Sequence, residues 1–206
     1  YTVRLQLTYR DGSFTDAQYV TFFVNPTYAT HNVNAIQLTL TNNGRIGFYD
    51  FPDNLLGQGF IFNGANSLFE GGLIVGTSST QVDDVVRNPA GTQNGDFKSS
   101  GFYTFLPTGI VSDQDGVTTF NDSLADANNK IGLLVDMRSY AFSDPGDSKF
   151  ILLQYNIKNN TRNSLTNLYA GLFLDWDIGN YDFNISSYDA ARSLGYAYDA
   201  GTGPST

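Results

Sequence analysis

The sequence of 206 residues contains no cysteine, one histidine and one glutamate. Without cysteine there is no disulfide framework, no cysteine-ligated zinc and no thiol nucleophile. A single histidine excludes metal sites that need several imidazoles. Basic residues are few, 11 against 20 acidic ones, and the net charge of −9 argues against nucleic acid, whose phosphates need clustered Lys and Arg. No apolar run approaches the roughly 18 residues of a membrane-spanning helix.

Residues that form turns are abundant instead. Of the 20 acidic residues 19 are Asp, and 20 Asn and 21 Gly accompany them. Asp and Asn bond to nearby backbone in turns and are poor in helix interiors, whereas 41% hydrophobic content is enough for a buried core. We therefore expect an all-β protein, an antiparallel β-sandwich with long loops. At most one or two short helices fit this pattern, at residues 81–87 and 187–193.

Apolar residues alternate with polar ones in several segments, which predicts strands buried on one face. The pattern is clearest in three late segments, at 131–142, 149–158 and 167–178. In the last of these, Trp176 shares a face with Leu172 and Leu174, so we expect it to face the core. Apolar residues also share a face in the first two, at Ile131, Leu133, Val135 and Met137, and at Ile151, Leu153, Tyr155 and Ile157. Earlier strand candidates are 36–40, 46–48, 59–62, 68–76, 101–106 and 117–120.

The two ends of the sequence predict a fragment of a larger polypeptide. Residues 1–26 form a hairpin pattern, with strands at 1–8 and 18–24 around the turn Asp11–Gly12, typical of the last strands of a preceding domain. Residues 27–32 are expected to be a linker. Residues 33–206 are expected to be one β-sandwich accessory domain, truncated at its C-terminus because 201–206 is a loop with no closing element.

Candidate catalytic groups are few. His31 would have to be the base of any Ser-His-Asp triad, but nothing places it near a serine, so we expect an exposed linker histidine. Asp175 and Asp177 lie on one strand face about 7 Å apart, within the range of glycosidase carboxylates. Apolar neighbours could raise the pKa of Glu70. The alternative for Glu70 is an ion pair with an arginine such as Arg87.

Calcium is the cofactor that the Asp-rich loops best predict, because hard cations take oxygen ligands from carboxylates and backbone carbonyls. An EF-hand is rejected since the required Glu is absent from the twelfth loop position. Ordinary turn formation, which favours the same residues, is the alternative. The candidate ligands lie in three groups: Asp113 and Asp115; Asp144 and Asp147; and Asp175, Asp177 and Asp182.

Sugar binding is the non-enzymatic alternative. Exposed aromatic rings can stack on pyranose rings while Asn and Asp bond to hydroxyl groups. The 13 Tyr and 20 Asn make such a module feasible. The sequence alone does not indicate which tyrosines would be exposed together.

A string of motifs resembles the region downstream of the catalytic domain in large secreted subtilisin-like serine peptidases of the Bacteroidetes and Ignavibacteria type, which are type IX secretion cargo. The resemblance covers residues 33–206. The motifs, in chain order, are Phe69-Glu-Gly-Gly-Leu-Ile-Val-Gly-Thr-Ser78, Val82-Asp-Asp-Val-Val-Arg87, Asp96-Phe97, Thr119-Phe-Asn-Asp122, Ser139-Tyr-Ala-Phe142, Phe150-Ile-Leu-Leu-Gln-Tyr155, Asn167-Leu-Tyr-Ala-Gly-Leu-Phe-Leu-Asp-Trp-Asp177 and Tyr188-Asp-Ala-Ala191.

This resemblance implies an extracellular or cell-surface bacterial accessory region that contacts neighbouring domains of its own polypeptide. Residues 1–26 would then be the tail of the Ig-like segment that follows the protease. No catalytic residue is carried over, because the His-Gly-Thr and Asp-Thr-Gly segments of these peptidases have no counterpart here. We therefore expect no enzyme activity from this fragment. The alternatives are a carbohydrate- or cell-surface-binding module and a subunit of an extracellular fibre or surface layer.

Overall fold

The computed structural model describes residues 2–21, 26–106 and 108–201. Within these ranges the chain forms strands and a single short 3-10 helix, so the expected all-β class is confirmed. None of its described helical residues forms a segment long and apolar enough to cross a membrane. The elements are β1 (Thr2–Leu5), β2 (Gln18–Thr21), β3 (Tyr28–His31), β4 (Ile36–Thr41), β5 (Arg45–Ile46), β6 (Phe60–Phe62), β7 (Ala65–Asn66), β8 (Leu68–Ser78), β9 (Gln81–Asp84), β10 (Lys98–Ser99), β11 (Thr104–Phe105), β12 (Gln114–Asn121), β13 (Leu133–Ala141), β14 (Ile151–Asn159), β15 (Tyr169–Trp176), η1 (Tyr181–Phe183), β16 (Asn184–Asp189) and β17 (Leu194–Asp199).

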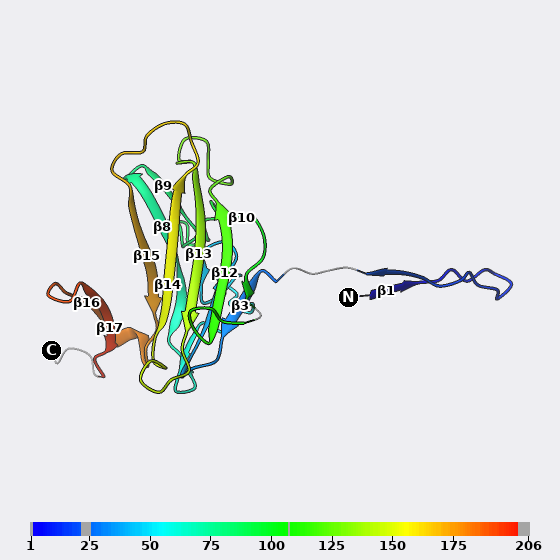
Figure 1. Cartoon of the computed structure of the whole chain (residues 1–206), viewed down its shortest axis with the longest axis horizontal. Coiled ribbons are helices and arrows are strands. Elements are labelled where there is room, and N and C mark those ends of the chain that lie inside the picture. The colour runs from blue at the N-terminus through cyan, green and yellow to red at the C-terminus, as the bar shows by residue number, and fades with distance from the viewer. Residues whose placement is uncertain (1, 22–25, 107, 202–206) are drawn as a thin grey trace.

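Two antiparallel sheets face each other and form the sandwich (Figure 1). One has the order β10-β12-β13-β14, with β11 also paired to β12. The other has the order β15-β8-β5-β4-β6-β7, with β3 paired to β4 and β9 to β8. Strands β14 and β15 follow each other in sequence but belong to different sheets, so the chain crosses between the sheets at this side of the sandwich.

The core lies between the two sheets and follows the predicted alternation. Leu133, Val135 and Met137 of β13 are fully buried, and so are Leu40 of β4 and Val75 of β8 from the opposite sheet. Complete burial of each such side chain contributes about 1.5–3 kcal/mol, so this interface supplies most of the driving force for folding. The three strongest strand predictions correspond to β13, β14 and β15.

Neither of the two segments that the sequence left open to a short helix, residues 81–87 and 187–193, is helical. Residues 81–84 form strand β9, which pairs with β8, and residues 184–189 form β16, which pairs with β17. Both segments are short, and pairing with a neighbouring strand satisfies their backbone groups where an isolated helical turn would leave most of them unpaired.

Part of the expected linker at 27–32 is also a strand. Residues 28–31 form β3, which pairs with β4, and His31 at its end is completely buried. The prediction of an exposed linker histidine is therefore wrong. Pairing with β4 turns this segment into a component of the sandwich.

The N-terminal hairpin β1–β2 is formed as predicted and lies apart from the sandwich (Figure 1). Its Leu5, Leu7 and Phe14 are 58%, 60% and 68% exposed, because a two-stranded hairpin alone has nothing against which to bury an apolar face. Residues 22–25, part of its predicted second strand, lie outside the described residues. That it belongs to a preceding Ig-like domain remains a prediction.

Candidate functional site

Glu70 and Asp175 face each other across neighbouring strands on the outer side of one sheet. Antiparallel pairing of β8 with β15 places Asp175 opposite Glu70. The register then shifts, so that Trp176 pairs with Leu68 and Phe69 is left without a partner. Such a bulge re-aims side chains. Here Glu70 points away from the core while Leu68, two residues before it, is buried inside.

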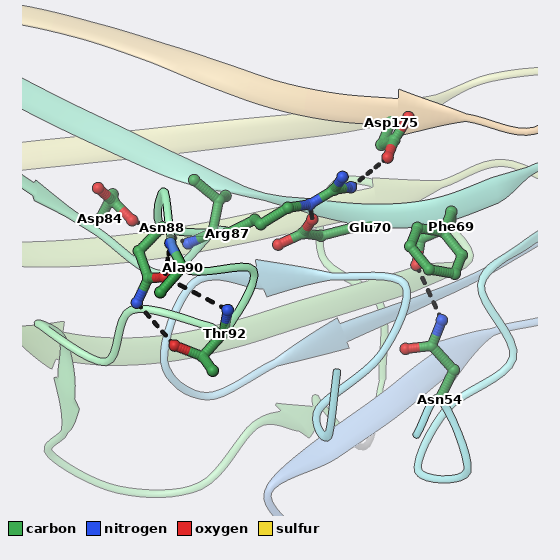
Figure 2. Close-up of polar contacts among 10 residues, drawn as sticks. Asn54, Phe69, Glu70, Asp84, Arg87, Asn88, Ala90, Thr92 and Asp175 are labelled. Atoms are coloured by element: carbon green, nitrogen blue, oxygen red, sulfur yellow. Dashed lines mark hydrogen bonds and ion pairs between the residues drawn. The ribbon is translucent and has the colours of Figure 1, made fainter. Parts of the chain in front are cut away.

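One arginine joins the two carboxylates (Figure 2). Arg87, from the segment after β9, donates from Nε to Oε2 of Glu70 at 3.0 Å and from Nη2 to Oδ2 of Asp175. Its guanidinium lies over the rings of Phe51 and Phe69, 5.5 and 5.7 Å from their centroids, in cation–π contact. The alternative of an ion pair between Glu70 and Arg87 is thus confirmed.

The electrostatics of Glu70 follow from its burial. The side chain is almost inaccessible to water, and this desolvation raises the pKa of Glu70 despite the opposing effect of Arg87. Its second oxygen, Oε1, has no hydrogen-bond partner. A glycosidase needs the scissile bond between its acid and its second carboxylate, but here the guanidinium occupies that position. The arrangement is an ion-pair cluster that fastens β8, β15 and the 87–94 loop together.

An open cleft of about 600 Å³ lies beside this cluster, between the end of β15 and the C-terminal hairpin. Phe69, Trp176 and Tyr181 supply aromatic surface to its wall, and Asp175 and Asp177 supply carboxylates. Burial, and next the charge of Asp175, raise the pKa of Asp177. Trp176 is half-buried and makes an edge contact with Phe60, 5.3 Å between centroids. It therefore packs against the core as expected.

His31 belongs to a buried polar cluster between the sheets. Its Nε2 lies 2.7 Å from Oγ of Ser139, and its Nδ1 lies 3.0 Å from Oε1 of Gln114. The hydroxyl of Tyr103 bonds to the same Ser139. His31, Ser139 and Tyr103 are all 0% exposed, so no substrate can reach this serine–histidine pair. Ser78, in the Gly-Thr-Ser segment, lies instead at the exposed end of β8.

Two of the three predicted cation groups lie close together. Asp113 accepts hydrogen bonds from the backbone N and Oγ of Ser143, directly before Asp144. Asp115 is buried and accepts from Ile110, Val111 and Ser112, and these bonds lower its pKa although burial opposes them.

Several of the other predicted ligands take part in hydrogen bonds within their own turns or in an ion pair. Asp144 accepts from the backbone of Gly146 at 2.9 Å and Asp147 donates its own backbone N–H to Asp144, both bonds closing one turn. Asp175 binds Arg87, and the backbone N–H of Asp182 is capped by Asn180. In the described part of the chain, no three His, Asp or Glu side chains gather in a way that could hold a metal. Calcium binding remains a prediction.

The structure contains a buried pair of carboxyl groups that was not predicted from the sequence. Asp83 and Asp122 are 0% and 2% exposed, and burial together with Asp122 raises the pKa of Asp83 far above its usual range. Asp83 accepts from the backbone N of Ile131 at 3.1 Å. In the sequence this segment is also compatible with a short helix, and the alternation over β9 is too short to indicate that Asp83 faces inward.

Comparison with known proteins identifies no relative. No protein-family model, no curated protein and no solved structure matches the chain.

We predict that Arg87→Met destabilises the fold by about 2 kcal/mol at pH 8, because the buried Glu70 carboxylate loses its countercharge. Arg87 is partly exposed, so the loss should stay below the roughly 3–5 kcal/mol expected when one partner of a fully buried ion pair is removed. The folded-state pKa of Glu70 lies above its unfolded value, so the penalty shrinks as the pH falls through that pKa. Urea unfolding at pH 8 and pH 4.5 measures both values.

The matched control is Arg192→Met, which removes an exposed ion pair with Asp189 and should cost less than about 0.5 kcal/mol. Adding Glu70→Gln to the Arg87 variant should restore most of the loss. An equal loss at both pH values would contradict the assigned role of Arg87.

We predict that His31 titrates near pH 4. Burial, opposed by the bond to Gln114, lowers its pKa from 6.5 to about 4. The unfolded chain therefore binds a proton first as the pH falls, and stability is complete above pH 6.5 and lost between pH 6.5 and about 4. This group alone removes about 2 kcal/mol between pH 7.5 and pH 5.

Because His31 is the sole histidine, its imidazole signals in an NMR titration are unambiguous. His31→Gln should show a smaller loss of stability between pH 7.5 and pH 5 than the parent chain. A titration midpoint near pH 6.5 would show that the imidazole is not buried as described.

Proposed function

We propose that the chain is a non-catalytic accessory region of a secreted bacterial multidomain protein, a subtilisin-like serine peptidase, and that it packs against neighbouring domains. Three of the candidate catalytic groups, Glu70, Asp175 and His31, take part in contacts that hold the fold together, and this observation supports the proposal most directly. Arg87 forms ion pairs with both Glu70 and Asp175, and His31 is buried between the sheets.

The peptidase context rests on the motifs of residues 33–206 and their resemblance to the region downstream of the protease. An extracellular or cell-surface location belongs to the same proposal. The hairpin β1–β2 is compatible with it, since its exposed apolar residues would be covered by the rest of a preceding domain. Under this proposal the sandwich is a partner of other domains in one polypeptide.

We expect residues 1–206 to hydrolyse neither casein nor aryl glycosides above the rate of a heat-denatured sample. Turnover that Glu70→Gln or Asp175→Asn abolishes would overturn the non-catalytic assignment. We also expect the encoding reading frame to contain His-Gly-Thr and Gly-Thr-Ser-Met-Ala segments upstream. A reading frame without them would remove the peptidase context while leaving the non-catalytic assignment intact.

Carbohydrate binding is a second candidate, favoured by exposed tyrosines on and next to the hairpin formed by β16 and β17. Tyr196 and Tyr198 are stacked on one face of β17, 6.2 Å between ring centroids, and are 44% and 45% exposed. Tyr181 and Tyr188 are 67% and 62% exposed. The net charge of −9 opposes anionic glycans, so a neutral polysaccharide is the expected ligand.

For this candidate we predict retention of the chain on at least one of cellulose, chitin, xylan or mannan in a pull-down assay. Replacing Tyr196 and Tyr198 by alanine should reduce retention about tenfold or more, since stacking on an aromatic ring supplies much of the contact. Replacing Tyr9, an exposed tyrosine on the N-terminal hairpin, by alanine should leave retention unchanged. Absence of binding to the whole panel would count against the candidate.

A further inference from the structure

A buried pair of carboxyl groups connects the two sheets of the sandwich. Asp83 lies on β9, which pairs with β8 in one sheet, and Asp122 directly follows β12 of the other sheet. The two residues are 0% and 2% exposed. Their carboxyl groups lie within hydrogen-bonding distance of each other. Two acidic groups of opposite sheets are therefore in contact where water does not separate them.

Both carboxyl groups also accept hydrogen bonds from the backbone just before β13. Oδ2 of Asp83 accepts from the N–H of Ile131 at 3.1 Å, and Oδ2 of Asp122 accepts from the N–H of Gly132. These two amides are consecutive, so they hold the carboxyl groups close together. Oδ1 of Asp83 is buried and accepts from no donor among the described residues. An ionised oxygen in this position is costly, whereas a protonated one can donate to Asp122.

The surroundings of Asp122 favour its ionised form. This residue borders an open cleft of about 620 Å³, and Lys98 and Lys130 lie on the wall of the same cleft. Positive charge near a carboxyl group stabilises the carboxylate. The cleft also gives protons in solution access to the pair. Asp122 is therefore the member of the pair that we assign as the carboxylate.

The charges that act on Asp83 are negative. They are those of Asp122 and, before β10, Asp96, which itself is surrounded by Asp84, Asp126 and Asp122. Burial is the largest cause of the shift, and together with these acids it raises the pKa of Asp83 to about 7, although the bond from Ile131 opposes it. Asp83 is therefore the member of the pair that we assign as the protonated acid.

We propose that Asp83 and Asp122 share one proton in mildly acidic solution, and that this proton closes a link between the two sheets which opens as the pH rises. In the closed link, Oδ1–H of Asp83 donates to the Asp122 carboxylate. Loss of the proton leaves two buried carboxylates in contact, and their repulsion loosens the segment that leads into β13. This proposal does not depend on the peptidase context or on glycan binding.

The link gives stability a pH dependence of definite sign. A carboxyl group whose pKa is raised in the folded state contributes stability that is fully present below its unfolded-state pKa, about 4 for Asp. That contribution is lost as the pH rises through the folded-state value of about 7. His31 has the opposite effect, because its pKa is lowered in the folded state. The test therefore compares chains that both retain His31.

Asp122→Asn in the full chain tests the link. Asparagine keeps the shape of the carboxyl group, and its amide can donate to Oδ1 of Asp83 at every pH. We expect the variant to unfold at a higher urea concentration than the parent at pH 8 and at nearly the same concentration at pH 5. Relative to the variant, the folding equilibrium constant of the parent should fall at least about tenfold from pH 5 to pH 8.

Two further variants serve as a replicate and as a control. Asp83→Asn should reproduce the effect of Asp122→Asn, because either amide can replace the shared proton. Asp126→Asn removes an exposed acid of the loop before β13 that does not belong to the pair, and it should keep the pH dependence of the parent.

Nuclear magnetic resonance observes the proton directly. We expect the carboxyl carbon of Asp83 to titrate well above the exposed aspartates, whose pKa values lie near 4. After correction for intrinsic exchange rates, the amides of Ile131 and Gly132 should exchange faster at pH 8 than at pH 5 in the parent. Neither Asn variant should show this difference.

Three results would overturn the proposal. The first is titration of the Asp83 carboxyl carbon in the range of the exposed aspartates. The second is a difference in stability between the parent and both Asn variants that is the same at pH 5 and pH 8. The third is a rise in the urea midpoint of the parent at pH 8 with millimolar calcium chloride that Asp122→Asn abolishes, which would make a cation, and not a proton, the group that balances the two charges.

Discussion

The structure depends on mutual burial of the inner faces of two sheets, and this burial is complete at one side of the sandwich and incomplete at the other. Strands β4, β8, β12 and β13 cover each other, and residues such as Leu40, Val75, Phe120 and Val135 are completely shielded from water. At β14 and β15 the same alternation continues, but no further strand among the described residues pairs with their outer edges. The apolar groove between β14 and β15, lined by Ile151, Leu153, Leu172 and Trp176, follows from this arrangement. The apolar alternation continues into these two edge strands, although no further described strand packs over them.

The polar side chains that are buried between the sheets have hydrogen-bond partners, which offset the cost of removing them from water. His31 and Ser139 lie between the sheets, where an unpaired polar atom would cost several kcal/mol, and they satisfy each other together with Tyr103 and Gln114. On the outer face, Arg87 supplies the countercharge for Glu70 and a hydrogen bond to its Oε2. Glu70, Asp175 and His31 thus take part in contacts that hold strands together.

The sequence allowed the class of fold and the longest strands to be predicted, because a period of two is a local signal. It also allowed Arg87 to be named as a partner of Glu70. It did not indicate that Asp175 completes the cluster, since that depends on the register of β8 with β15 and on a bulge at Phe69. The burial of His31 was missed for the same reason, because it depends on pairing with β4 and on contacts more than 80 residues away. The conformation of short segments such as 81–87 could not be predicted from the sequence, because pairing with a neighbouring strand determines it.

The abundance of Asp over Glu has a physical consequence beyond turn formation. Short acidic side chains such as Asp115 bond to their own loops, so the charge is held close to the ends of the strands. A chain with an unprotected edge and an exposed apolar groove would ordinarily pair with copies of itself. Here every copy carries the same net charge of −9, and repulsion grows as two acidic edges approach. The acidity therefore opposes close approach of identical chains at these edges.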